Sequence, residues 1–305
     1  MKYLNLDGNL NASAVIMGCM RLKQLTLKEA EALIQTALEL GINYFDHADI
    51  YGGGSCESIF SESIGRRPSI REKIILQGKC GIYKGGYDFS KEHILDAVDG
   101  ILDRLKTEYL DVLLLHRPDT LMEPEEVAEA FSHLSKSGKV RRFGVSNFNA
   151  GQIAFLQNAL PQKLLFNQLQ FGLAHTPLID SGMCVNMKIE QNVSRTEGTL
   201  EYCRLNGITI QAWSPFRQNF ANTPFIDDME HYSELNLVLR ELSELYGISP
   251  SALAVAWILR HPANMQVILG TTKPERLRDE VRGTEVVLSR EQWYRLYKAA
   301  GNRIP

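Results

Sequence analysis

The chain has 305 residues, of which 44% are hydrophobic and 23% are charged. This composition supplies a large apolar core and excludes a disordered or collagen-like chain. Its 33 basic and 36 acidic residues give a formal net charge of −3. The sequence therefore has no basic excess of the kind that binds nucleic acid or an anionic membrane surface.

The sequence also indicates where in the cell the protein is expected. No apolar run approaches the roughly 20 residues that cross a bilayer. The opening residues, MKYLNLDGNL, contain no continuous apolar segment like that of a signal peptide. The cysteines are odd in number and lack the spacing of a zinc or redox site, so we expect reduced thiols in a cytoplasmic protein. They are Cys19, Cys56, Cys80, Cys184 and Cys203.

Short apolar runs, typical of strands buried on both faces of a parallel sheet, alternate with longer amphipathic segments. We expect eight such strands, at residues 15–19, 43–50, 73–80, 111–117, 140–147, 165–171, 209–215 and 266–272. Helix starts between them include a capping-box pattern at Thr26–Glu29 and serine N-caps at Ser90, Ser249 and Ser289.

Strands that are each followed by a helix favour a closed barrel over an open sheet. No G-x-G-x-x-G motif follows an early strand, which disfavours a Rossmann domain. The sequence therefore predicts one domain over residues 1–305, with the α/β fold of a (β/α)₈ TIM barrel. A hairpin near 3–12 is expected to close its bottom, and two extra helices are expected near 233–246 and 290–300.

Polar residues gather where three neighbouring strands end, which is where barrels of this type place their active sites. Asp46 and Tyr51 follow the second strand, Lys79 the third, and His116 the fourth. Each residue alone has an ordinary structural explanation. Lys79 is harder to explain in that way, because an amine directly after a buried strand must find a counter-charge or lose its proton.

We predict that Asp46, Lys79 and Tyr51 form one charge-coupled unit. A free phenol has a pKa of about 10, and a nearby ammonium group is expected to lower it. Asp46 would keep Lys79 charged, and a neutral His116 would position the substrate oxygen. Such a group can protonate an oxygen that becomes alkoxide-like during a reaction.

The tract Asp46-His-Ala-Asp-Ile-Tyr51-Gly, then Lys79, Leu-Leu-Leu-His116 and Gly144-Val-Ser-Asn147, resembles the aldo-keto reductase superfamily, and most of all a bacterial oxidoreductase subgroup. The likeness runs from Met17 to Asp279. It implies NADPH-dependent reduction of an aldehyde or ketone to an alcohol by hydride transfer. Tyr51 would be the general acid, Asp46 and Lys79 would tune its pKa, and His116 would orient the carbonyl group.

The resemblance also implies cofactor contacts. Ser146, Asn147 and Gln168 would bind the nicotinamide carboxamide, and Trp213 would stack on its ring, where the family usually has tyrosine. The segment from Gly270 that opens a helix would bind the 2′-phosphate of NADP⁺ or NADPH. The full predicted set is Gly18, Met20, Ser146, Asn147, Gln168, Trp213, Ser214, Thr271, Thr272, Lys273 and Arg276. No metal site is assigned.

Some positions depart from the family pattern. His47 replaces a small residue and would add bulk and a proton donor at the rim, Glu280 stands where many members have asparagine, and Gly270 where some have lysine. The long connection 173–198 is expected to be a lid, a substrate wall, an oligomer contact or disordered. Substrate specificity is expected in the loops 81–90, 118–124, 173–198 and 216–232.

Two other functions remain open from the sequence. Lys79 could act as a Schiff-base amine in a barrel aldolase or lyase. Alternatively, the chain could be a non-catalytic, NADPH-binding regulatory subunit, like the channel-associated subunits built on this fold. The expected partner of the enzyme is a small carbonyl substrate.

Overall fold

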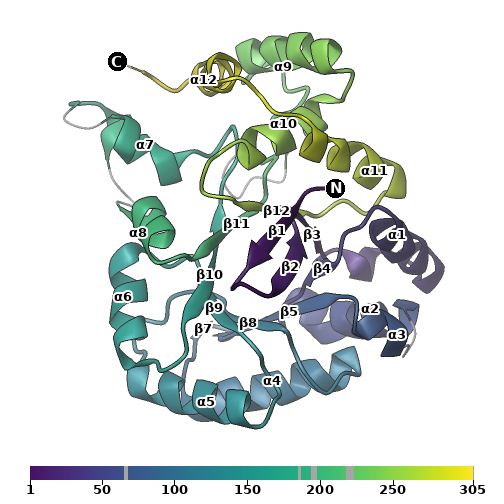
Figure 1. The fold of residues 1–305 in the computed structure, drawn as a ribbon, viewed down its shortest axis with the longest axis vertical. Helices are drawn as coiled ribbons and strands as arrows, with labels where there is room; N and C mark the ends of the chain where they lie inside the picture. Colours follow the sequence, from purple (N-terminus) through teal and green to yellow (C-terminus); the bar gives the residue numbers. More distant parts are fainter. Residues whose placement is uncertain (65–67, 185–186, 194–197, 218–222, 305) are drawn as a thin grey trace.

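The computed structural model describes residues 1–64, 68–184, 187–193, 198–217 and 223–304. Its parallel strands form a closed barrel in the order β10-β11-β12-β3-β4-β5-β8-β9 (Figure 1). They are β3 (Val15–Gly18), β4 (Tyr44–Asp46), β5 (Ile75–Cys80), β8 (Val112–Leu115), β9 (Phe143–Ser146), β10 (Leu164–Gln170), β11 (Thr209–Trp213) and β12 (Gln266–Leu269). Each overlaps one of the eight predicted runs, so the predicted TIM barrel is confirmed.

Helices surround the barrel (Figure 1). They are α1 (Leu27–Glu39), α2 (Ser55–Ile64), α3 (Pro68–Arg71), α4 (Lys91–Leu105), α5 (Pro124–Lys136), α6 (Ala150–Ala159), α8 (Thr199–Leu205), α10 (Pro250–Leu259) and α11 (Pro274–Val281). Short 3₁₀ helices are η1 (Leu22–Gln24), η2 (Tyr51–Gly54), η3 (Glu190–Asn192) and η4 (Arg282–Glu285). The predicted capping box of Thr26 and Glu29 starts α1, and the predicted serine caps start α4, α10 and α12 (Arg290–Ala299).

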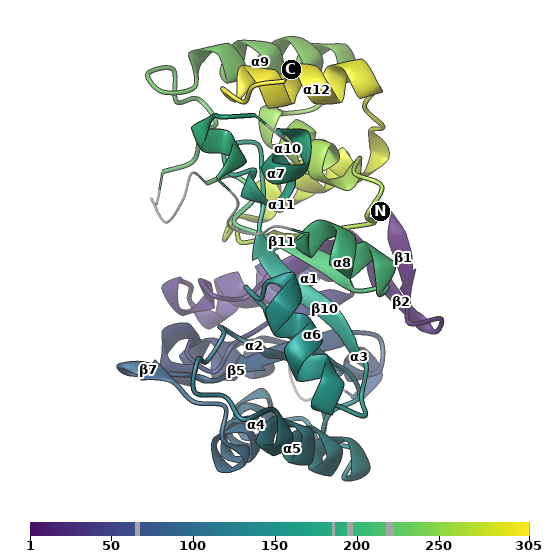
Figure 2. The same ribbon diagram turned by 90° about the vertical axis from the view of Figure 1, so that its left-hand side faces the viewer.

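Two hairpins lie at opposite sides of the barrel (Figure 2). The predicted one pairs β1 (Tyr3–Leu6) with β2 (Leu10–Ser13), and it buries Leu4, Leu6 and Leu10 beneath the barrel. The other pairs β6 (Ile82–Tyr83) with β7 (Gly86–Tyr87) directly after β5. The sequence predicts a variable loop at this place and not this second hairpin, because two-residue strands carry almost no periodic signal.

The two predicted extra helices are α9 (Ser233–Tyr246) and α12. They lie side by side beyond α10 (Figure 2) and are joined by an ion pair between Arg295 and Glu241. α12 is anchored to α10 because the rings of Trp257 and Trp293 stack with centroids 4.8 Å apart, and each indole N–H donates to the other residue's carbonyl. These helices therefore extend the wall of the barrel on one side.

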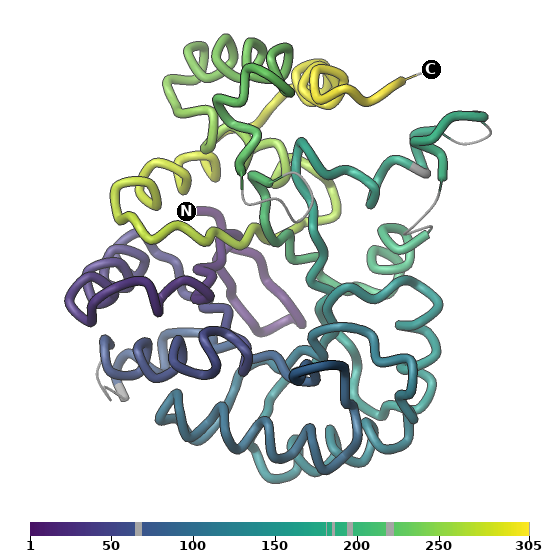
Figure 3. Tube along the Cα trace, turned by 180° about the vertical axis from the view of Figure 1, so that it is seen from behind, coloured from purple at the N-terminus to yellow at the C-terminus, as the bar shows by residue number. Residues whose placement is uncertain are grey.

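The long connection after β10 contains a helix, α7 (Pro177–Met183). Its described part lies beside the C-terminal segment (Figure 3), where Tyr297 donates to Asp180 at 2.7 Å and the backbone N–H of Arg303 donates to Gln191 at 2.9 Å. Residues 185–186 and 194–197 of this connection, and 218–222 of the next predicted specificity loop, lie outside the described residues. The described part of the connection is therefore held by the last helix and by the segment that follows it.

The five cysteines are free thiols and all are buried, in agreement with the sequence. In the part of the chain that the structure describes, no single helix combines the length and apolar character needed to cross a membrane. The pair α9 and α10, bent by 89°, meets those criteria only when the two helices are taken together.

Candidate active site

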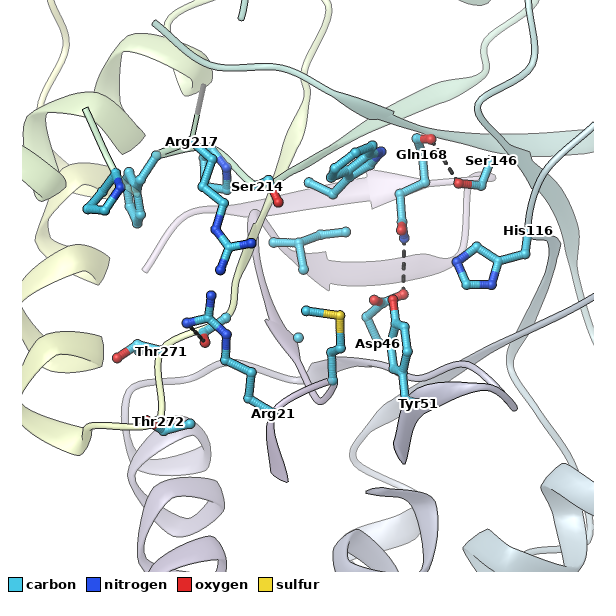
Figure 4. A pocket seen from close by; sticks show the side chains of 18 of the residues that line it. Arg21, Asp46, Tyr51, His116, Ser146, Gln168, Ser214, Arg217, Thr271 and Thr272 are labelled. Carbon is cyan, nitrogen blue, oxygen red and sulfur yellow. Dashed lines mark hydrogen bonds between the residues drawn. The ribbon is translucent and has the colours of Figure 1, made fainter. Parts of the chain in front are cut away.

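A pocket of about 690 Å³ opens where the barrel strands end (Figure 4). Every predicted cofactor residue lines it, together with Asp46, Tyr51 and His116 of the predicted catalytic group. Lys79 does not line the pocket, because it lies fully buried behind Asp46. Strands that are far apart in the sequence therefore bring the predicted residues to one cavity.

Asp46 is the last residue of β4, and its carboxylate forms a buried ion pair with the Lys79 ammonium from β5. The side-chain amide of Gln168 also donates to the same oxygen at 3.0 Å (Figure 4). The side-chain amide of Gln77 donates to it at 2.6 Å. Burial lowers the pKa of Lys79, while the negative charge of Asp46 opposes that shift. The predicted counter-charge for Lys79 is confirmed.

Tyr51 opens η2, in which Gly52 and Gly53 adopt φ values of 62° and 66°. Glycine takes this left-handed conformation without a steric cost, and the turn holds the phenol over the end of the barrel. The Lys79 ammonium lies 5.0 Å from the centroid of the Tyr51 ring. The His116 ring meets it edge-on, with centroids 6.0 Å apart.

The expectation that the pKa of Tyr51 lies below its ordinary value is wrong for this structure. Burial, followed by the negative charge of Asp46, raises the pKa of Tyr51 well above its ordinary value. Loss of hydration penalises the phenolate form, and this outweighs the attraction of a neighbouring ammonium. The phenol therefore stays protonated, as a proton donor must be before it reacts.

His116 follows β8, and its ring is turned toward Tyr51 (Figure 4). Burial lowers the pKa of His116 well below its ordinary value, and the positive charges of Lys79 and Arg117 act in the same direction. The imidazole is therefore neutral at physiological pH, as the sequence analysis expected. A neutral imidazole can hydrogen-bond a carbonyl oxygen without adding a charge to the site.

Polar groups at the ends of β9 and β11 are linked by hydrogen bonds. Asn147 donates to the Ser146 hydroxyl at 2.8 Å, and the Trp213 indole donates to Asn147 at 3.2 Å. Asn147 and Ser214 both have positive φ, at 63° and 49°. Such strained backbone positions cluster at functional sites. The Gln168 amide nitrogen donates a hydrogen bond to the Asp46 carboxylate, so Gln168 helps to hold this carboxylate as well as lining the pocket.

The other end of the pocket lies at the start of α11. Thr271, Thr272 and Lys273 precede this helix and Arg276 is in its first turn, where free N–H groups and the helix dipole favour an anion. Glu280 lines the same end, and burial together with Asp279 raises the pKa of Glu280 to about 7.

Two further cations line the pocket and were missed by the sequence analysis. Arg21 follows β3 and donates to the Gly270 carbonyl at 3.2 Å. Arg217 faces it from the loop after β11, so that the two guanidinium groups point toward each other (Figure 4). Burial, and then the charge of Arg21, lower the pKa of Arg217. Two like charges held across a cavity favour an anionic group between them.

Gln77 and Arg117 were also missed, although the sequence contains a signal for each. Gln77 lies two residues before Lys79, so both side chains project from the same face of β5. Arg117 directly follows His116 and lines the pocket. No comparable signal marks Arg21 and Arg217, since the path of a loop is not readable from one sequence.

His47 lies elsewhere than the sequence analysis expected. Its side chain does not line the pocket: it is fully buried and packs edge-on against Phe60 of α2, with ring centroids 4.6 Å apart. Burial lowers the pKa of His47 to about 3. Among the described residues, no group of three or more His, Cys, Asp or Glu side chains is arranged to hold a metal ion.

This burial makes His47 a source of acid sensitivity. The unfolded chain binds the His47 proton near pH 6.5, whereas the folded chain binds it only near pH 3, so stability falls as the pH drops below 6.5. Between pH 7.5 and 5.0 the loss from this residue is about 2 kcal/mol. Urea unfolding at both pH values should show that the His47→Leu variant loses about that much less than the wild type. Equal losses would contradict a buried, neutral His47.

The aldo/keto reductase family model matches residues 14–300. An uncharacterized oxidoreductase of Bacillus subtilis, YcsN, is 36% identical, and the alignment covers 100% of each chain. A 6-dehydroglucose reductase of Agrobacterium fabrum is 31% identical over 98% of each chain. A crystal structure of an aldo/keto reductase from Klebsiella pneumoniae, in complex with NADP and acetate, has a TM-score of 0.78 at 21% identity and covers 99% of this chain and 96% of that one.

The similarity to the Klebsiella structure agrees with the barrel fold of this chain. At 21% identity, this similarity supports the fold alone. The family model covers nearly all of the chain, and the Bacillus relative aligns with it from end to end. This chain therefore belongs to the aldo/keto reductase family of oxidoreductases.

Proposed function

We propose that the protein uses NADPH to reduce an aldehyde or ketone to an alcohol, with Tyr51 as the proton donor. One observation carries the proposal. A single pocket contains the Asp46, Tyr51 and His116 group at one end and the cationic start of α11 at the other. This arrangement fits a dinucleotide that lies extended between a reaction centre and a phosphate-binding site.

The residues of the pocket suit such a cofactor at three points. The cations Lys273 and Arg276, beside a helix N-terminus, suit the 2′-phosphate. Arg21 and Arg217 suit the negatively charged phosphates in the middle of the dinucleotide. Trp213 offers an aromatic face to the nicotinamide ring, and the linked Ser146 and Asn147 offer polar atoms to its carboxamide. The NADP bound to the Klebsiella relative supports the same assignment.

NADPH supplies the hydride when it is bound, and the protein supplies the proton and the positioning. The neutral His116 hydrogen-bonds the carbonyl oxygen and holds it near Tyr51. The protonated Tyr51 phenol then donates its proton to that oxygen as negative charge develops there. Lys79 lies beneath the Tyr51 ring and stabilises the phenolate that remains, while Asp46 holds Lys79 in place.

The two alternative functions are less well supported. A Schiff-base amine must reach the substrate, whereas Lys79 is buried, paired with Asp46 and absent from the pocket lining. A purely regulatory, cofactor-binding subunit would not need Tyr51, His116 and the Asp46–Lys79 pair to meet beside the nicotinamide position. The buried free thiols fit a reducing compartment, and we propose a cytoplasmic enzyme with a small carbonyl substrate.

A fluorescence titration with NADPH and NADH, followed by a screen of aldehydes and ketones, tests this function. We expect NADPH to bind and its absorbance at the reduced-nicotinamide band to fall only when both enzyme and carbonyl compound are present. Binding of NADPH without turnover of any carbonyl would favour the regulatory function. A borohydride-trapped adduct on Lys79, without NADPH oxidation, would favour the aldolase or lyase.

The preference for NADPH over NADH is expected to depend on Arg276. Arg276→Ala removes a charge-assisted hydrogen bond to the 2′-phosphate, so the Kd of NADPH should rise about 10- to 100-fold and that of NADH should change little. Arg278→Ala is the matched control, because Arg278 is on the same helix but pairs with Glu39 instead of lining the pocket. Equal effects of Arg276→Ala on both cofactors would show that Arg276 does not bind the 2′-phosphate.

A further inference from the structure

A network of buried polar side chains crosses the interior of the barrel. The interior of a barrel of this type is filled mainly by bulky apolar side chains. Here it also contains buried polar ones, namely Tyr44, Gln77, Gln168, Gln211 and Gln266. Burying an amide or a hydroxyl group costs free energy unless the group is hydrogen-bonded, and apolar side chains of similar shape can replace a bonded pair at little or no cost in stability. Stability alone therefore does not account for the network.

The hydrogen bonds of the network converge on one oxygen of the Asp46 carboxylate. Asp46 Oδ1, which pairs with the Lys79 ammonium, also accepts from the amides of Gln77 and Gln168 (Figure 4). Asp46 and Gln77 lie on β4 and β5, whereas Gln168 lies on β10, at the opposite side of the ring of strands. The carboxylate is therefore held from both sides of the barrel.

Gln211 of β11 determines the direction in which these two amides donate. Its Oε1 accepts from Nε2 of Gln77 at 3.0 Å and from Nε2 of Gln168 at 3.2 Å. Each of these nitrogens carries two N–H groups, so one is directed at Gln211 and the other at Asp46. If the Gln211 amide were turned over, its own N–H groups would face those of Gln77 and Gln168. The orientation of Gln211 therefore fixes both amide donors of the carboxylate.

The orientation of Gln211 is fixed in turn by groups deeper in the barrel. Its Nε2 donates to the Tyr44 hydroxyl at 3.2 Å and to Gln266 Oε1 at 3.1 Å. The Tyr44 hydroxyl donates to Gln77 Oε1 at 2.8 Å, and Gln266 donates to the backbone carbonyl of Ser13 at 2.9 Å. A carbonyl oxygen can only accept a hydrogen bond. Ser13, at the end of the β1–β2 hairpin, therefore sets the direction of donation along the network.

We infer that Tyr44, Gln77 and Gln211 are positioning residues, which hold the carboxylate and the ammonium of the reaction centre in place beneath the proton donor. None of the three lines the pocket, so they act on the reaction through the carboxylate. An error of about 1 Å in the position of a catalytic group can cost about 100-fold in rate. The inference rests on the proposed carbonyl reduction and adds residues of the barrel interior to its machinery.

Two variants test the inference through the single-turnover rate of NADPH oxidation, with the carbonyl compound that the wild type reduces fastest in the screen. Tyr44→Phe removes one hydroxyl group and keeps the ring that fills the barrel. We expect it to lower the rate about 3- to 10-fold, the effect of one neutral hydrogen bond, with a nearly unchanged Kd of NADPH. Gln211→Met keeps the length of the side chain but frees both amide donors, and it should lower the rate about 10- to 100-fold.

Gln157→Met is the matched control. Gln157 is a half-buried glutamine of α6 that donates to the Gln162 carbonyl at 2.9 Å and accepts from the backbone N–H of Leu164 at 2.8 Å. Leu164 begins β10, whereas the pocket lies where the strands end. Gln157→Met should therefore lower the stability measured by urea unfolding and leave the single-turnover rate unchanged. Circular dichroism verifies that each variant is folded, and if Gln211→Met is not, Tyr44→Phe decides.

A second background separates positioning of the carboxylate from a general loosening of the barrel. The double variant Asp46→Asn/Lys79→Met lacks both the carboxylate and the ammonium. If Tyr44 acts only through them, adding Tyr44→Phe to this background should change the remaining rate less than about 2-fold, which is within the range of independent effects. A loosened barrel would lower the rate in both backgrounds alike.

Three results would overturn the inference and leave the proposed reductase function intact. Tyr44→Phe could retain the wild-type rate, it could lower the rate as much in the double-variant background as in the wild type, or Gln157→Met could lower the rate as much as Tyr44→Phe. If the wild type itself oxidises NADPH with no carbonyl compound, the proposed function fails, and the inference fails with it.

Discussion

The Tyr51→Phe variant is expected to reduce carbonyl substrates at least about 100-fold more slowly than the wild type, because it lacks the phenolic proton that general-acid catalysis requires. The ring remains, so its contacts with Lys79 and His116 should persist and the Kd of NADPH should be nearly unchanged. The measurement is the single-turnover rate of NADPH oxidation, which is not masked by slow release of the cofactor.

Tyr83→Phe provides the control for this experiment. Tyr83 lies in the exposed β6–β7 hairpin and does not line the pocket, so removal of its hydroxyl should leave the rate unchanged. If Tyr51→Phe retained the wild-type single-turnover rate, Tyr51 would not be the proton donor. A loss of NADPH binding in Tyr51→Phe would instead indicate a structural role for the hydroxyl.

The second large effect concerns the buried pair of Lys79 and Asp46. Lys79→Met leaves the Asp46 carboxylate buried without its counter-charge, which typically costs about 3–5 kcal/mol of stability. In the double variant Asp46→Asn/Lys79→Met no charge remains, and an asparagine can still accept from the Gln77 and Gln168 amides. The double variant should therefore recover most of the lost stability.

Catalysis should not recover with stability. The double variant lacks the ammonium that stabilises the Tyr51 phenolate, so its single-turnover rate is expected to stay at least about 100-fold below that of the wild type. Urea unfolding and NADPH oxidation measured on both variants separate the two effects. A double variant that regained activity would show that Lys79 contributes only to folding. One as unstable as Lys79→Met would show that the loss does not come from the unpaired charge.

The barrel could be predicted because its signal is repeated along the chain. Buried strands such as Val15–Gly18 and Val112–Leu115 are apolar runs, and each is followed by an amphipathic helix, the first of which begins at the capping box of Thr26. Once the strands are placed, the ends of neighbouring strands must meet, and this brings Asp46, Lys79 and His116 together. Helix starts could be predicted from the same kind of local pattern, as the confirmed N-cap Ser249 of α10 shows.

What could not be predicted depends on tertiary surroundings. The charge of Lys79 was expected to dominate the pKa of Tyr51, but the cost of burying a phenolate is larger, and burial is a property of the fold. His47 was placed at the rim, whereas it directly follows β4 and its side chain packs against Phe60. Arg217 reaches the pocket from a loop whose path a single sequence does not reveal.

We propose that hydride passes from NADPH to a carbonyl carbon in this pocket. It is tested most directly with NADPH that carries deuterium at both C4 positions, incubated with the protein and 4-carboxybenzaldehyde, followed by mass spectrometry of the alcohol. We expect one deuterium on the carbon that bore the aldehyde, and almost none of this labelled alcohol from the Tyr51→Phe variant in the same time. An alcohol without deuterium, or no alcohol from this or any other carbonyl compound, would contradict it.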